Sequence, residues 1–147
     1  MAGKEGRSPV ASSEAVSKSM RSNKGRDTGP ELKVRRMLRD MGYPGYRLNW
    51  KKAPGKPDIT YPGRKIAIFV NGCFWHRCPN CALSLPKSHT EFWKAKFDRN
   101  VERDRRNIDD LESEGWRVLV IWECEIKKHP DTVEGELREL LESSKPR

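Results

Sequence analysis

The fold is decided by the stretch Asp58-Ile59-Thr60-Tyr61-Pro62-Gly63-Arg64-Lys65-Ile66-Ala67-Ile68-Phe69-Val70-Asn71. The turn residues Pro62-Gly63-Arg64 separate two groups of strand-forming residues, so the sequence predicts a hairpin of strands over 58–61 and 65–71. The second strand is apolar at every position from 66 to 70, which is typical of a strand covered on both faces. A later apolar run, 118–122, has the same character. These runs predict an α/β domain, a central sheet flanked by helices.

Further elements follow on either side of this hairpin. Residues 30–41 predict a helix that starts at a favoured proline and stops before Gly42, and 46–50 predict a short strand. Residues 72–89 form a loop rich in Cys, Pro and His, and a long helix is expected over 90–114, ended by Gly115. A last helix is expected to open at Asp131-Thr132-Val133-Glu134, which resembles a capping box.

The positive charge of the chain is concentrated near its start. The 147 residues suit one domain and carry a formal charge of +9. Residues 1–52 hold thirteen Lys and Arg against five Asp and Glu, whereas the rest holds seventeen against sixteen. We therefore expect a flexible basic arm over 1–25, suited to a polyanion or acting only as a solubilising tail, and one domain over 26–147.

No stretch of the sequence indicates a membrane or a secretory route. No apolar run approaches the roughly 20 residues that span a bilayer, and the N-terminus has no apolar stretch of signal-peptide type. We expect a cytoplasmic protein, nucleoid-associated in a prokaryote, whose cysteines stay reduced unless they hold a metal.

Three acids are candidates for a site. Asp58 follows a proline and enters a hairpin, a layout found in nucleases that bind Mg²⁺ through an aspartate, although an Asp in a turn before a strand is also common. Glu31 lies in the first turn of the first helix, where the helix dipole favours an acid. Asp104 lies on the apolar stripe of the long helix with Phe97, Val101, Ile108 and Leu111. Burial of a carboxylate is costly, so Asp104 requires an imidazole, an arginine or a metal as its partner.

The four cysteines of the chain predict a zinc site. Their spacing, with a Cys-x₂-Cys pair, suits a closed tetrahedral structural site better than a redox motif, and the residues are Cys73, Cys78, Cys81 and Cys124. His76 lies in the same loop and is either a further ligand or a free base near neutral pH. Phe74, Trp75 and Trp93 are large aromatics on or next to this polar loop, where they either pack together or enter DNA as wedges.

Several blocks together resemble one family. The block Asn71-Gly72-Cys73-Phe74-Trp75-His76 closely resembles the Gly-Cys-Phe-Trp-His signature of the Vsr endonucleases. The resemblance extends in order over residues 17–127, through the blocks Ser19-Met20-Arg21, Arg26-Asp27-Thr28, Thr90-Glu91-Phe92-Trp93, Asn100-Val101-Glu102-Arg103-Asp104-Arg105-Arg106, Gly115-Trp116-Arg117-Val118-Leu119 and Trp122-Glu123-Cys124.

This resemblance implies a restriction-endonuclease-like core that nicks double-stranded DNA 5′ of the thymine in a T:G mismatch, as a monomer and in very short patch repair. It implies catalytic Mg²⁺ held by Asp58 and the Val70 carbonyl, His76 as the base, Asp104 as its support and Glu31 near the metal-bound waters. Structural Zn²⁺ would be held by the four cysteines. The implied DNA contacts come from Met20, Asn71, Phe74, Trp75 and Trp93.

Two positions depart from the pattern of the family. Asn71 stands where many members carry a second histidine, and Cys78 stands where a histidine often binds zinc. Two alternatives to mismatch repair therefore stay open. One is a related nickase of a restriction or defence system with another specificity, and the other is a non-catalytic, zinc-stapled DNA-binding module.

Overall fold

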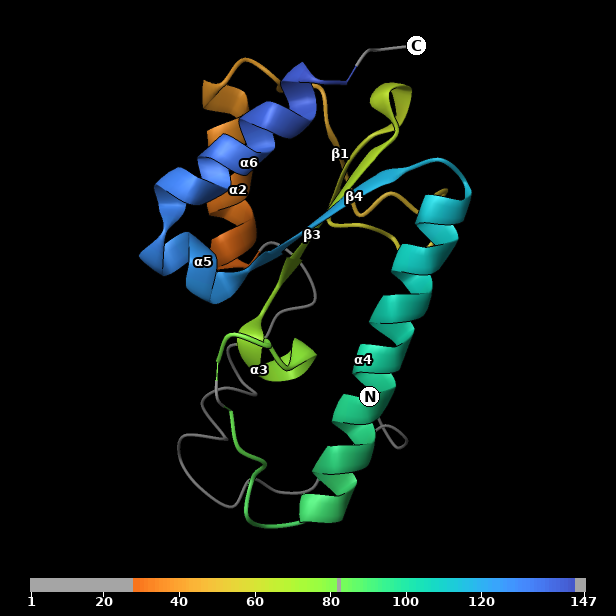
Figure 1. Cartoon of the computed structure of the whole chain (residues 1–147), viewed down its shortest axis with the longest axis vertical. Coiled ribbons are helices and arrows are strands. Elements are labelled where there is room, and N and C mark those ends of the chain that lie inside the picture. Colours follow the sequence, from red (N-terminus) through yellow and green to blue (C-terminus); the bar gives the residue numbers. More distant parts are fainter. Residues whose placement is uncertain (1–27, 82, 145–147) are drawn as a thin grey trace.

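A four-stranded mixed sheet forms the centre of the molecule (Figure 1). The structure is a computed structural model that describes residues 28–81 and 83–144. The strands are β1 (Arg47–Leu48), β2 (Ile59–Tyr61), β3 (Ile66–Asn71) and β4 (Arg117–Trp122), arranged in that order. β1, β2 and β3 are antiparallel neighbours, whereas β3 and β4 are parallel. The hairpin predicted from the sequence over 58–71 is therefore confirmed.

The turn of this hairpin is the short 3-10 helix η1 (Pro62–Arg64), which ends in a left-handed Lys65. Ile59 pairs with Ile68 and Tyr61 with Ile66. Asp58 immediately precedes β2. Because β2 and β3 are antiparallel, this start of β2 lies beside the carboxyl end of β3. The strand expected over 46–50 is shorter than predicted, because only Arg47 and Leu48 pair with β2.

One face of the sheet is covered by three helices, α2 (Gly29–Asp40), α5 (Glu123–Lys128) and α6 (Pro130–Glu142) (Figure 1). Their apolar side chains pack on the alternate β3 residues Ile66, Ile68 and Val70. α5 was not expected from the sequence. The last helix begins one residue earlier than expected, at Pro130, and its N-cap His129 makes no side-chain cap, so the predicted capping box is wrong. Proline at the first position fixes the helical φ instead.

The opposite face is covered by α4 (Thr90–Ser113), whose Leu111 packs with Ala67 and Trp116. Gly115, at φ +88°, ends the helix as predicted, because a left-handed residue there allows the Trp116 N–H to bond the Leu111 carbonyl. The N-terminal half of α4 extends past the sheet and lies beside the short helix α3 (Cys73–His76) (Figure 1). Helices on both faces explain why β3 is apolar at nearly every position.

The N-terminal arm expected over 1–25, including Met20, lies outside the described residues. Within the described part of the chain, no helix has an apolar run long enough to cross a bilayer.

Candidate active site and metal centre

A cavity of about 740 Å³ lies where α2, the β2–β3 hairpin, α3 and α4 meet. We call it the central cavity. It gathers the candidate residues of four separate chain segments, so Asp58 and His76 lie in one site and not on opposite sides of the molecule. The candidates that line it are Glu31, Asp58, Val70, Asn71, Phe74, Trp75, His76 and Asp104.

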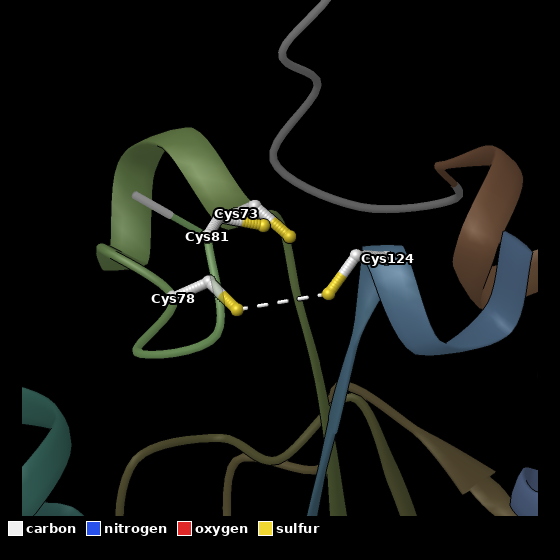
Figure 2. Close-up of side chains that lie close together, drawn as sticks. All are labelled: Cys73, Cys78, Cys81 and Cys124. Atoms are coloured by element: carbon white, nitrogen blue, oxygen red, sulfur yellow. Dashed lines mark hydrogen bonds between the residues drawn. The ribbon is translucent and has the colours of Figure 1, made fainter. Parts of the chain in front are cut away.

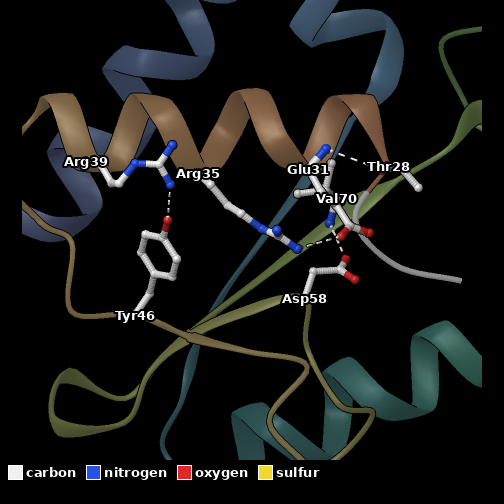
Figure 3. A network of polar contacts seen from close by, with 7 residues as sticks. All are labelled: Thr28, Glu31, Arg35, Arg39, Tyr46, Asp58 and Val70. Carbon is white, nitrogen blue, oxygen red and sulfur yellow. Dashed lines mark hydrogen bonds and ion pairs between the residues drawn. The ribbon is translucent and has the colours of Figure 1, made fainter. Parts of the chain in front are cut away.

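Asp58 is held in this cavity by the hairpin. The Val70 N–H donates to Asp58 Oδ2 at 2.7 Å, which ties the carboxylate to the end of β3 (Figure 3). Val70 also lines the cavity, and the role of its carbonyl as a magnesium ligand stays a prediction. The backbone pairing of β2 and β3 therefore fixes where this acid stands.

Glu31 faces Asp58 from the first turn of α2 (Figure 3). The helix starts at Thr28, whose Oγ1 accepts from the Glu31 N–H at 3.3 Å. The Glu31 side chain is buried, and its Oε1 lies 3.3 Å from the Arg35 guanidinium one turn later. Arg35 balances only part of the negative charge, because two carboxylates share the space.

This arrangement raises the pKa of Asp58. Burial is the largest cause, and the negative charge and hydrogen bond of Glu31 add to it, whereas the Val70 N–H and His76 oppose it. The net result moves the pKa from an ordinary 3.8 to about 7. A half-buried acid pair of this kind favours a bound proton or a bound cation, and oxygen ligands are the ones that Mg²⁺ prefers.

The raised pKa predicts a pH-dependent stability. Between pH 3.8 and about 7 the folded state keeps the Asp58 proton that the unfolded state loses, so the free energy of unfolding falls as pH rises. We expect Asp58→Asn to be more stable than the wild type by on the order of 2 kcal/mol at alkaline pH without added Mg²⁺, and by less in mild acid.

Urea denaturation of both proteins at about pH 5 and about pH 8 measures this difference. Chelators are left out so that any zinc stays bound. Adding Mg²⁺ at the higher pH should stabilise the wild type alone. An identical pH response of the two proteins would contradict the charge pair.

His76 forms the second polar pair of the cavity. It is the last residue of α3, and its Nδ1 lies 2.6 Å from Asp104 Oδ2 on α4. Asp104 is half-buried, and the Arg103 guanidinium lies 4.0 Å from its other oxygen. The expected imidazole partner of Asp104 is therefore found, and the arginine pairing is a weak addition. A carboxylate on Nδ1 leaves Nε2 as the atom that accepts a proton.

The four cysteines form a metal-binding cluster (Figure 2). Their Sγ atoms lie within 4.8 Å of one another, and Cys78 and Cys124 are 3.7 Å apart. Tetrahedral zinc with Zn–S bonds of about 2.3 Å places sulfurs about 3.8 Å apart, so the spacing fits. Burial raises the pKa of Cys73 and of Cys124. At Cys78 burial has the same direction, but the Asn80 N–H and the other thiols outweigh it and lower the pKa.

The cluster joins two parts of the chain. Cys73 opens α3, Cys78 and Cys81 follow it, and Cys124 lies in the first turn of α5 directly after β4. A metal there would fix α3, and with it His76, to the end of the central sheet.

The aromatic candidates pack on one another. Phe74 and Trp75 are half-buried with ring centroids 5.1 Å apart, and Trp93 stacks on Phe97 at 5.6 Å. Of the two alternatives for Trp93, packing fits its burial, because only 3% of the side chain is accessible beneath these rings. Val101 was expected on the buried stripe of α4 and is 46% exposed, whereas Phe97, one turn earlier, is buried. Only Phe74 and Trp75 line the central cavity.

Some residues of the site were missed by the sequence analysis. Arg35 pairs with Glu31 at an i, i+4 spacing that the sequence offers. The Asn100 amide donates to the Trp75 carbonyl at 3.2 Å and so holds α3 against α4. Glu123 lines the cavity and forms an ion pair with Lys127 at 3.1 Å; it lies in one of the blocks that resemble the family, but that block gave it no role.

An acid pair that favours a cation, placed beside an imidazole oriented by a carboxylate, suits the hydrolysis of a phosphodiester. The chain is an endonuclease. It belongs to the Vsr family, because the model of the DNA mismatch endonuclease Vsr matches residues 9–82 and because curated relatives match most of the chain. The expected restriction-endonuclease-like fold is thereby confirmed.

Three relatives illustrate the range of the family. The type II nicking enzyme V.XorIIP of Xanthomonas oryzae pv. oryzae is 41% identical over 85% of this chain and 90% of its own. The DNA mismatch endonuclease Vsr of Escherichia coli is 39% identical over 86% of this chain and 80% of its own. The type II nicking enzyme V.NmeAIP of Neisseria meningitidis is 44% identical over 69% of this chain and 72% of its own.

Proposed function

We propose that this endonuclease nicks one strand of duplex DNA 5′ of the thymine in T:G mismatches that arise when 5-methylcytosine deaminates. The observation that carries the proposal is the single cavity shared by Asp58, Glu31 and the His76–Asp104 pair. We place its work in the cytoplasm, on the DNA of the nucleoid. One active site cuts one strand, so a monomer suffices.

The residues of the cavity divide the work between them. Asp58 and the Val70 carbonyl would hold Mg²⁺, which neutralises the charge that develops on the scissile phosphate. Asp104 accepts a hydrogen bond from His76 Nδ1–H, which orients the ring and leaves Nε2 to take the proton of the attacking water. Glu31 keeps the Asp58 carboxylate in place and lies close enough to bond waters at the cation. Zn²⁺ on the four cysteines would be structural.

Recognition of the mismatch is assigned to the aromatic side of the cavity. Phe74 and Trp75 would enter the base stack, where unstacking costs a few kcal/mol per step and less at a mismatch. Trp93 would support these rings from below, as its burial indicates. Asn71 is buried at the end of β3 and would contact DNA with its amide. Met20 would add an apolar contact from the minor-groove side, and the basic arm would add salt-dependent affinity.

A second function has an observation in its favour. Two of the three relatives described above are named type II nicking enzymes, at identities similar to that of the mismatch endonuclease. A nickase attached to a restriction system, with other sequence or mismatch preferences, would use the same cavity. A non-catalytic DNA-binding module is the third alternative, since Asn71 replaces a histidine, but it leaves the oriented His76–Asp104 pair without a use.

A panel of duplexes separates these functions. We expect Mg²⁺-dependent nicking of T:G duplexes to exceed that of the matched T:A duplexes by at least about 100-fold, which corresponds to about 2.7 kcal/mol of easier deformation. The panel holds all mismatches within several flanking sequences, at one stated salt concentration. Equal cutting of matched and mismatched DNA would reject the repair function. Preference for another mismatch would favour the restriction-linked nickase, and binding without any nick would favour the module.

A further inference from the structure

A second hollow lies beside the central cavity. It has a volume of about 680 Å³ and lies between α4 and the loop that connects β1 to β2. We call it the basic groove. Its charged lining residues are four cations and one acid: Lys51, Lys52, Lys56, Arg103 and Glu114. The cations are exposed, and an exposed hollow with this balance of charge attracts an anion.

The basic groove continues the central cavity. Gly55, Lys56, Arg103 and Asn107 line both hollows. The Arg103 guanidinium lies 4.0 Å from Asp104, whose other oxygen bonds His76. A chain of phosphates that places one member in the central cavity therefore brings its neighbours to the basic groove.

The floor of the groove is fixed by packing. Ala53 is buried against Leu111 and Trp116, so the connecting loop is anchored in the core. Gly55, at φ +77°, approaches α4 so closely that a Cβ there would lie 2.7 Å from Asn107 Cγ. The lysines on either side of this contact therefore project from a backbone with little freedom to move, which lowers the entropy lost when they bind.

From these observations we infer that the basic groove binds backbone phosphates of the nicked strand next to the scissile phosphate. The inference rests on the proposed function, since it takes duplex DNA as the ligand, and it adds a subsite to it. None of the described residues that line the groove is aromatic, so its contacts would be to phosphates and would carry no sequence information. The groove positions the strand, and the central cavity performs the chemistry.

The test is the double variant Lys51→Ala/Lys52→Ala, because these two lysines line the groove and not the central cavity. Loss of two phosphate contacts should reduce the slope of log Kd against log salt by about 1.8. We expect about tenfold weaker binding at about 0.1 M salt, to matched and mismatched duplexes alike.

The control is Lys128→Ala/Arg138→Ala, which removes the same charge from exposed positions on α5 and α6, across the sheet from α4 (Figure 1). This control should reduce the slope of log Kd against log salt by less than half of the reduction expected for the groove variant. A second double variant, Lys51→Arg/Lys52→Arg, keeps the charge and should bind as the wild type does, which separates lost contacts from misfolding.

Two results would overturn the inference. One is an unchanged salt slope in the Ala/Ala groove variant, and the other is an equal loss in the groove variant and its control. Either result leaves the nicking assays of the wild type as they are. Conversely, a wild type that binds DNA but never nicks it overturns the proposed function, while the salt slopes still report on the groove.

Discussion

Asp58→Ala is expected to lower Mg²⁺-dependent nicking of the preferred duplex by at least about 10³-fold, which corresponds to about 4 kcal/mol of transition-state stabilisation. Asp58 accepts a hydrogen bond from the Val70 N–H of β3 and faces Glu31, the other acid of the cavity. Burial and the neighbouring Glu31 raise the pKa of Asp58 to about 7, as expected of a carboxylate that a bound cation would stabilise. Its removal leaves His76 and Asp104 intact but takes away the proposed Mg²⁺ ligand.

The binding of DNA should survive the same change. Phe74, Trp75 and the basic surface are untouched, so the Kd for a mismatched duplex without Mg²⁺ should stay within about threefold of the wild type. Single-turnover nicking and a binding titration measure the two quantities. Asp40→Ala is the matched control, since it removes an exposed carboxylate from the end of α2 and should nick normally. If Asp58→Ala keeps a tenth of the wild-type nicking activity, Asp58 is not the ligand of the catalytic Mg²⁺.

The part of the site that the sequence predicts is the part that local patterns determine. A turn between two apolar strands fixes the β2–β3 register, and the register places Asp58 beside Val70. The close spacing of three cysteines, with a fourth after an apolar run, likewise predicts their cluster, because parallel pairing brings the carboxyl ends of β3 and β4 together. The positions of Asp58 and of the cysteine cluster could therefore be predicted largely from the pairing of the strands.

The rest depends on packing between distant segments. The burial cost of Asp104 requires a partner, but only the angle of α4 across the sheet decides that the partner is His76 and not an arginine. Val101 was placed on the buried stripe of α4 and is instead exposed, for a related reason. The position where α4 leaves the sheet decides which of its faces is covered, and helical periodicity does not contain that position. α5 was missed because its six residues are too few for a period to show.

Replacement of Cys78 by serine is expected to release the metal of the cysteine cluster and to lower the Tm by about 10 °C, which for a domain of this size corresponds to about 3–5 kcal/mol. Cys78 is the most buried of the four, and the loop around it has few backbone hydrogen bonds besides Cys78 N–H to Cys73 O and Cys81 N–H to Cys78 O. The core that lies on the other face of the sheet includes none of the described residues of this loop, so the domain should stay folded while the loop loosens. Nicking should fall with the metal, because His76 lies between Cys73 and Cys78, two residues of the cysteine cluster.

Metal analysis of the purified proteins and thermal denaturation measure both effects, with about one equivalent of zinc expected in the wild type. Cys78→His is the informative companion, because an imidazole also binds zinc at about 2.0–2.1 Å whereas serine does not replace a thiolate. It should keep the metal and most of the Tm, although the side chain is larger and differently shaped. If Cys78→Ser and Cys78→His lose stability equally, and the wild type holds less than half an equivalent of zinc, the cluster is packing alone. If Cys78→His keeps the metal and Cys78→Ser loses it, the cluster binds metal through its ligand atoms. The position of His76 would then depend on the metal bound by the four sulfurs.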